Sequence, residues 1–124
     1  MKKVLVVDDS KTVRQYHREI LKQKGYDVCE AENGMEALEK SLVSEYELFL
    51  VDINMPVMDG YSFVKELRCK ENYRFTPVIM ISTEAEDHDR ISAYKNGANL
   101  YFTKPVKPDD LVGSVDILTY RSAA

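Results

Sequence analysis

The sequence predicts a doubly wound α/β fold, in which helices cover both faces of a five-stranded parallel sheet. Short runs rich in β-branched apolar residues lie at 4–7, 48–51 and 78–81, as is typical of strands buried on both faces. Segments with helical spacing of apolar residues alternate with these runs. No linker interrupts the 124 residues, so we expect one domain spanning 1–124.

The remaining elements follow from polarity and spacing. Two runs of mixed polarity, at 26–31 and 99–103, are expected to be edge strands. Apolar residues at helical spacing predict five helices, around residues 13–21, 38–42, 61–67, 91–94 and 108–118. Right-handed crossovers between successive strands make the sheet parallel.

Helix boundaries carry their own signals. Asn33 and Asp59, each followed by glycine, are predicted N-caps. Pro108 suits a first helical turn, and Asn96-Gly97 suits a helix end.

Composition excludes several classes of protein. The formal charge is −4 and no run of Lys and Arg is long enough to follow a phosphate backbone, so we expect no direct nucleic-acid binding. Apolar stretches are far shorter than the ~20 residues of a membrane helix, and no signal-peptide pattern is present, so we expect no membrane association. Cys29 and Cys69 form no C-x-x-C motif and are expected to be packing residues of a cytoplasmic protein.

Polar residues follow the predicted strands at the point where each strand ends. Asp8 and Asp9 follow the first strand, Asp52 the third, Ser82 the fourth and Lys104 the fifth. Parallel strands end at one edge of the sheet, so these side chains should meet there. Asp and Ser are also common at strand-to-loop transitions for structural reasons alone. However, close carboxylates repel one another by ~4 kcal/mol per pair at an effective dielectric of 20, which favours a functional reason for gathering three of them.

The expected chemistry follows from the charges. Oxygen ligands with room for water suit Mg²⁺, which relieves carboxylate repulsion. The third carboxylate would then face a cation and a lysine, and could attack a phosphoryl group to form an acyl phosphate. No glycine-rich loop follows the first strand, which excludes a dinucleotide fingerprint and a P-loop.

Four segments resemble the signature blocks of the response-regulator receiver domain, and the resemblance extends over essentially the whole chain. Within that family the chain is most similar to single-domain CheY-like regulators of chemotaxis. The resemblance implies the strand order 2-1-3-4-5 and a phosphoacceptor switch that catalyses only its own phosphotransfer and autodephosphorylation. The segments are Val7-Asp8-Asp9-Ser10, Val51-Asp52-Ile53-Asn54-Met55-Pro56 with Met58-Asp59-Gly60, Ile79-Met80-Ile81-Ser82-Thr83-Glu84-Ala85, and Phe102-Thr103-Lys104-Pro105.

The resemblance also implies which residues bind the metal and the phosphoryl group. Asp52 corresponds to the phosphoacceptor, which is phosphorylated by a sensor histidine kinase of the CheA type. Asp8 and Asp9 correspond to the pair that holds Mg²⁺, with Asp52 and the backbone carbonyl of Asn54 as further ligands. Lys104 corresponds to the lysine that pairs with the phosphoryl oxygens.

The resemblance also assigns residues to the conformational switch that follows phosphorylation. The resemblance implies a cis bond from Lys104 to Pro105, and phosphoryl binding by Ser82 and the backbone amide of Thr83. Ser82 stands where threonine is commoner, which keeps the hydroxyl and loses a methyl group. Tyr101 corresponds to the switch aromatic that turns inward when Ser82 is drawn to the phosphate, although it also fits an ordinary edge-strand aromatic.

The partner surface is implied to lie on the fourth helix, fifth strand and fifth helix. Lys95, Tyr101 and Lys107 are expected near that face, where a downstream target protein would bind a monomeric regulator. Two alternatives remain open. The chain could be the receiver part of a longer regulator. It could also be an aspartate-nucleophile phosphatase of the haloacid-dehalogenase kind, although that family separates its two aspartates by one residue and Asp8 and Asp9 are adjacent.

Overall fold

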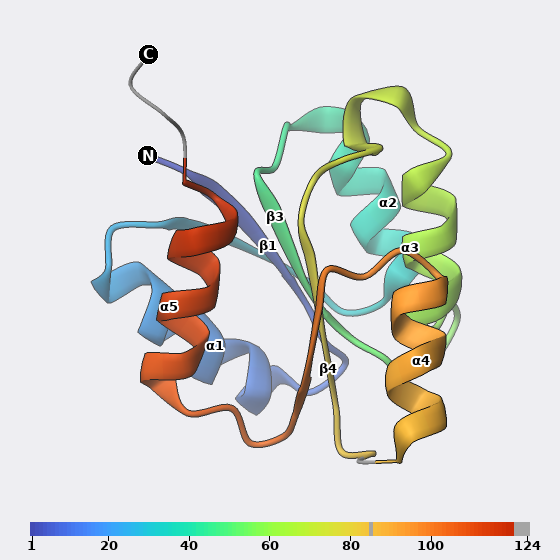
Figure 1. Ribbon diagram of the computed structural model, residues 1–124. Coiled ribbons are helices and arrows are strands. Elements are labelled where there is room, and N and C mark those ends of the chain that lie inside the picture. Colours follow the sequence, from blue (N-terminus) through green and yellow to red (C-terminus); the bar gives the residue numbers. More distant parts are fainter. Residues whose placement is uncertain (85, 121–124) are drawn as a thin grey trace.

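The fold is a five-stranded parallel sheet with helices on both faces (Figure 1). The computed structural model describes residues 1–84 and 86–120. Ala85, the last residue of one of the quoted segments, and residues 121–124 lie outside the described part. The strand order is β2-β1-β3-β4-β5, so the predicted fold class is confirmed.

Strands and helices alternate along the chain as predicted. The strands are β1 (Lys3–Val7), β2 (Asp27–Ala31), β3 (Leu48–Asp52), β4 (Val78–Ser82) and β5 (Leu100–Thr103). The helices are α1 (Lys11–Gln23), α2 (Gly34–Val43), α3 (Gly60–Arg68), α4 (Asp87–Lys95) and α5 (Pro108–Leu118), with a short 3₁₀ helix η1 (Glu71–Tyr73) before β4.

The polarity of each strand matches its place in the sheet. Every residue of β3 and β4 is buried, as the continuous apolar runs predicted. The two strands of mixed polarity, β2 and β5, lie at the two edges of the sheet, where part of each strand faces solvent.

The helices form two layers, and an apolar core lies between each layer and the sheet. Helices α1 and α5 cover one face of the sheet and α2, α3 and α4 the other (Figure 1). Neighbouring residues of β1 alternate between them: Val4 and Val6 pack towards α1 and α5, whereas Leu5 and Val7 pack towards α2 and α3.

Both predicted N-caps are confirmed. The side chain of Asn33 accepts a hydrogen bond from the backbone N–H of Glu36 at 2.9 Å, and Asp59 accepts one from Ser62 at 2.8 Å. The cap of α1, Ser10, was not predicted.

The expectation that both cysteines are packing residues is correct for only one of them. Cys29 is partly buried against the core of α2 and α3. Cys69 is exposed, because it caps the end of α3 and lies beyond the last buried turn of that helix. None of the described helices is long and apolar enough to cross a membrane.

Gly60 allows α3 to start directly against the end of β3. A Cβ atom at this position would lie 2.5 Å from the carbonyl oxygen of Asp52 and 2.9 Å from the Cα atom of Ile53. The Gly60 N–H donates to the Ile53 carbonyl at 2.8 Å. The start of α3 therefore fixes the backbone that carries Asp52.

Replacing Gly60 by alanine should destabilise the protein by about 1–3 kcal/mol, because the contacts with Asp52 and Ile53 involve backbone atoms that have little room to move. Gly113→Ala is the matched control. Gly113 lies inside α5 with nothing within 4 Å of the added Cβ, so alanine there should stabilise by about 0.5–1 kcal/mol. Urea unfolding of both variants measures the difference, and equal effects would contradict the close approach at Gly60.

Candidate functional site

The polar residues predicted to meet at one edge of the sheet do meet there. Asp8 directly follows β1, Asp52 ends β3, Ser82 ends β4, and Lys104 directly follows β5. Asp8, Asp52 and Ser82 are almost completely buried, with exposed fractions of 2%, 6% and 0%. The carboxyl ends of four parallel strands thus form a single polar centre.

Three carboxylates gather closely at this centre. One oxygen from each of Asp8, Asp9 and Asp52 lies within 4.8 Å of the others. Asp9 is exposed, whereas the other two are buried. The Lys104 ammonium nitrogen lies 3.0 Å from Asp8 Oδ2 and 3.0 Å from Asp52 Oδ1, and so pairs with both buried carboxylates.

Asp8 is held by hydrogen bonds on every side. Its Oδ1 accepts from the N–H of Ser10 at 2.9 Å, and its own N–H donates to the carbonyl of Ala31 at 3.1 Å. Its carbonyl oxygen accepts from Arg14 Nη1 at 2.7 Å. Arg14 could not be predicted from the sequence, because a lone arginine on a predicted helix carries no signal of a contact with a strand end.

Burial and charge perturb the titration of the buried groups. Burial, together with the negative charge of Asp8, raises the pKa of Asp52 from the ordinary value of 3.8 to about 6. Burial alone would lower the pKa of Lys104, but its hydrogen bonds to Asp8 and Asp52 raise it. Burial of His17 lowers its pKa to about 4, so the imidazole is neutral at pH 7.

This donor set fits a hard divalent cation. Three carboxylate oxygens converge, one of them from an exposed residue, and carboxylate oxygen is a ligand type that Mg²⁺ prefers. The pKa of Asp52 is raised, so the positive charge of Lys104 alone does not offset the burial of the ionised carboxylate and its repulsion by Asp8. A second positive charge at this centre would stabilise the ionised form further.

Ser82 and Tyr101 both contact the same residue of the β4–α4 loop. The Ser82 hydroxyl accepts a hydrogen bond from the N–H of Glu84 at 3.0 Å, and the Tyr101 hydroxyl donates to the carbonyl of Glu84 at 2.5 Å. Glu84 thus connects the buried hydroxyl at the end of β4 to the aromatic ring of β5. Sequence spacing could not identify Glu84, because both contacts involve its backbone.

Tyr101 is buried, with an exposed fraction of only 4%. The Arg90 guanidinium lies over its ring, 5.2 Å from the centroid. The structure thus holds the ring inward. Lys95 and Lys107 are exposed, as expected for residues near a partner face.

The other residues implied by the resemblance lie in loops around the centre. Asn54 and Thr83 are exposed, two residues after Asp52 and one after Ser82. The peptide bond from Lys104 to Pro105 is cis, as the resemblance implied.

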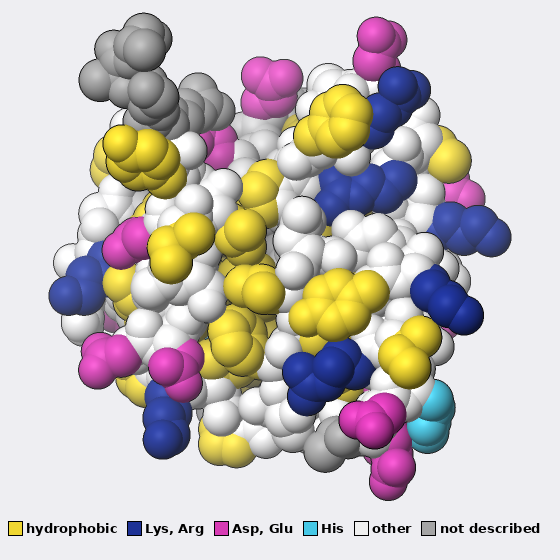
Figure 2. Space-filling view, viewed as in Figure 1, with side chains coloured by type: hydrophobic (Ala, Val, Ile, Leu, Met, Phe, Trp, Pro, Cys, Tyr) yellow, Lys and Arg dark blue, Asp and Glu magenta, His cyan; other side chains and the backbone are white. Residues whose placement is uncertain are grey.

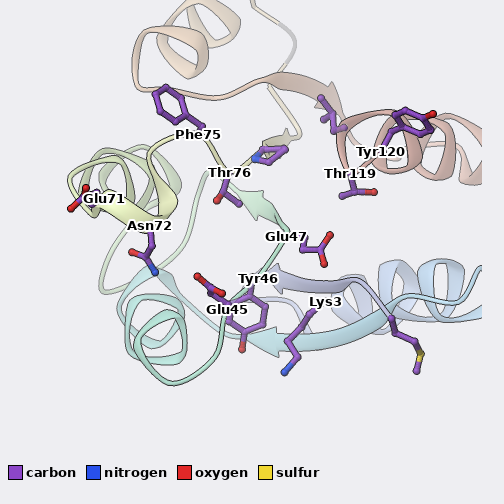
Figure 3. A pocket seen from close by; sticks show the side chains of 13 residues that line it. Lys3, Glu45, Tyr46, Glu47, Glu71, Asn72, Phe75, Thr76, Thr119 and Tyr120 are labelled. Carbon is purple, nitrogen blue, oxygen red and sulfur yellow. The ribbon is translucent and has the colours of Figure 1, made fainter. Parts of the chain in front are cut away.

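A separate hollow lies at the opposite end of the sheet (Figure 3). It has a volume of about 640 Å³ and is bordered by Lys3, at the start of β1, and by Glu47, just before β3. Phe75 and Tyr120 lie on its rim. None of the three clustered carboxylates lines it, so the polar centre and this hollow are separate features.

Replacing Asp52 by asparagine should stabilise the protein at pH 7 in the presence of a chelator. The fold raises the pKa of Asp52, so the protonated carboxyl stabilises the folded state. This stabilisation is complete below the unfolded pKa near 4 and is lost as the pH rises through about 6. The gain of Asp52→Asn should therefore be on the order of 1–3 kcal/mol above pH 7 and should vanish near pH 4. Thermal unfolding of wild type and variant at each pH measures it.

Comparison of the two proteins at the same pH cancels the contribution of His17, which titrates in an overlapping range. Asp9→Asn is the control, because Asp9 is exposed and its neutralisation should stabilise less. A gain that stays constant from pH 4 to pH 7 would contradict the raised pKa of Asp52.

Comparison with known proteins identifies the family. Residues 4–116 match the response regulator receiver domain. The chain is 40% identical over 118 residues to chemotaxis protein CheY1 of Helicobacter pylori (strain J99), covering 94% of this chain and 95% of that protein. It is 36% identical over 121 residues to transcriptional regulatory protein ResD of Bacillus subtilis (strain 168), covering 98% of this chain but 49% of ResD. The chain thus spans about half the length of ResD.

Solved structures agree with these relatives. Chemotaxis protein CheY4 of Vibrio cholerae superposes with a TM-score of 0.90 at 37% identity, covering 95% of this chain and 98% of that one. A putative response regulator from Chloroflexus aurantiacus gives a TM-score of 0.93 at 30% identity, covering 97% and 98%. With a matching family model over most of its length and the acidic centre in place, the chain belongs to the response regulator receiver domain family.

Proposed function

We propose that this protein is a phosphorylation-controlled binding switch that accepts a phosphoryl group on Asp52 from a sensor histidine kinase. Receiver domains accept phosphate from histidine kinases. The cluster of Asp8, Asp9 and Asp52 in this chain is the acidic triad that is typical of receiver domains that bind Mg²⁺. The observation that carries the proposal is the environment of Asp52: a buried carboxylate 3.0 Å from Lys104 and clustered with Asp8 and Asp9.

The transfer follows from these groups. A carboxylate oxygen of Asp52 attacks the phosphorus of a phosphohistidine, the P–N bond breaks, and the imidazole leaves with its electron pair and takes up a proton. Lys104 pairs with the phosphoryl oxygens and neutralises their charge. Bound through Asp8, Asp9, Asp52 and the backbone carbonyl of Asn54, Mg²⁺ would supply further positive charge. Receiver domains are phosphoacceptor signalling modules rather than conventional enzymes, and the match to this family excludes the phosphatase alternative.

The switch begins at Ser82. Its hydroxyl and the backbone amide of Thr83 bind the phosphoryl oxygens, which changes the hydrogen bond that Ser82 shares with Glu84. Because Tyr101 also binds Glu84, a shift of this loop alters the position of the ring. Phosphorylation then favours one arrangement of the β4–α4 loop over the other, by the difference in free energy of these contacts between the two arrangements.

The proposed output surface is the face of α4, β5 and α5. Basic and apolar side chains lie side by side on it (Figure 2). Arg90 and Lys95 are exposed on α4, which also carries the exposed Ile91 and Tyr94, and Lys107 is exposed just before α5. A surface of this kind suits a target segment that carries both acidic and apolar side chains.

Chemotaxis is the process that we propose, because this chain covers nearly all of CheY1, a chemotaxis protein, at 40% identity. We propose a monomer in the cytoplasm, where a kinase of the CheA type has access to ATP. The alternative is the receiver part of a longer regulator, which the match to about half of ResD favours.

Incubation with Mg²⁺ and acetyl phosphate should add one phosphoryl group to the wild type and none to Asp52→Asn. Lys104→Met should slow the labelling on the order of 10²-fold, because it removes the cation next to the acceptor oxygen. Intact-mass spectrometry measures both. Labelling of Asp52→Asn, or labelling that persists with a chelator, would contradict the assignment.

Beryllofluoride, a mimic of the phosphoryl group, should shift the NMR signals of Ser82, Glu84 and Tyr101 and of residues along α4. Ser82→Ala should still bind the mimic but lose the shifts at Tyr101 and α4, because it no longer holds the Glu84 amide. Tyr101→Phe is the complementary variant: it keeps the Ser82 contact and loses only the bond to the Glu84 carbonyl. Distant shifts that survive in Ser82→Ala rule out this route.

A further inference from the structure

We propose that Arg14 is a positioning residue that sets the Mg²⁺ affinity of the site by fixing the peptide group between Asp8 and Asp9. This inference rests on the proposed function, because it takes these two aspartates as metal-holding residues. Arg14 itself touches neither carboxylate; it acts through the backbone that joins them.

The Arg14 contact lies on the peptide group that leads into Asp9. Arg14 Nη1 donates to the carbonyl oxygen of Asp8 at 2.7 Å, and this oxygen belongs to the peptide plane that continues into Asp9. Within the described chain, no hydrogen bond or ion pair holds the Asp9 carboxylate. The backbone places the Cα–Cβ bond from which this carboxylate reaches the other two, and Arg14 holds the peptide group before it.

Arg14 is itself anchored to the sheet. Its Nε donates to Glu30 Oε1 at 3.2 Å, and its side chain is only 12% exposed. Glu30 belongs to β2, where it pairs in register with Val6 of β1, two residues before Asp8. The guanidinium thus bridges an edge strand and the loop that follows the neighbouring strand, in a fixed fork geometry.

Arg18 offers an internal comparison. It also pairs with Glu30, through Oε2 at 3.2 Å, but makes no contact with Asp8. Arg14 places a positive charge next to the backbone of Asp8, so a purely electrostatic effect predicts tighter Mg²⁺ binding when that charge is removed. Positioning predicts weaker binding for Arg14 alone. The two explanations differ in sign.

The test is a Mg²⁺ titration of the unphosphorylated protein, followed by NMR amide shifts. We expect Arg14→Met to raise the Kd for Mg²⁺ about tenfold, the range in which partners of metal-binding groups act. Arg18→Met, which loses the same kind of ion pair with Glu30, should change the Kd by less than about twofold. Equal or tighter binding by Arg14→Met would overturn the inference.

Arg14→Lys keeps the charge but cannot hold the Asp8 carbonyl and the Glu30 carboxylate together, so its Kd should lie between those of the wild type and Arg14→Met. If Arg14→Met fails to fold, this variant decides: an unchanged Kd overturns the inference. If the wild type itself shows no Mg²⁺-dependent shifts, the proposed function fails. If the wild type binds Mg²⁺ and Arg14→Met binds it with the same Kd, only the role of Arg14 is refuted.

Discussion

The rest of this structure depends on one interaction, the repulsion between two buried carboxylates that a single lysine partly neutralises. Asp8 and Asp52 lie at the ends of adjacent strands and are both almost fully buried. Lys104 reaches both carboxylates from beyond β5, so the pairing requires the sheet order that brings these three strand ends together. The compensation is incomplete, as the raised pKa of Asp52 shows, and the centre therefore favours additional positive charge.

The surrounding fold keeps this unfavourable cluster in place through backbone contacts. Gly60 lets α3 start against the carbonyl of Asp52, and the N–H of Gly34 at the start of α2 donates to the carbonyl of Met58 in the loop after β3. Helix starts thus bind the loop on one side of Asp52, while Arg14 binds the loop after β1 on the other. Each of these contacts is made to a main-chain atom, so together they fix the backbone that carries the carboxylates.

Sequence pattern predicted the strands and the site residues for a common reason. Apolar runs end where the sheet ends, so Asp8, Asp52 and Ser82 could be placed from local polarity alone. Arg14 and Glu84 could not, because their contacts involve backbone atoms of loops, which no pattern of side chains marks. The expected burial of Cys69 was wrong for a similar reason: helical spacing does not reveal where the buried face of α3 stops.

The proposed switch acts on the helix with the fewest buried residues among α1 to α5. Within α4 only Ala93 is buried, and the helix is held largely by polar contacts: the Tyr61 hydroxyl donates to the carbonyl of Asp89 at 3.1 Å, and Arg90 lies over the ring of Tyr101. Segments with little buried apolar surface have small free energies of rearrangement. A change of one or two hydrogen bonds at Ser82 and Glu84, about 1 kcal/mol each, is therefore comparable to the free energy that fixes α4, whereas it would be negligible against the buried strands. Weak apolar packing of α4 is thus the property through which the proposed phosphorylation of Asp52 would change a distant surface.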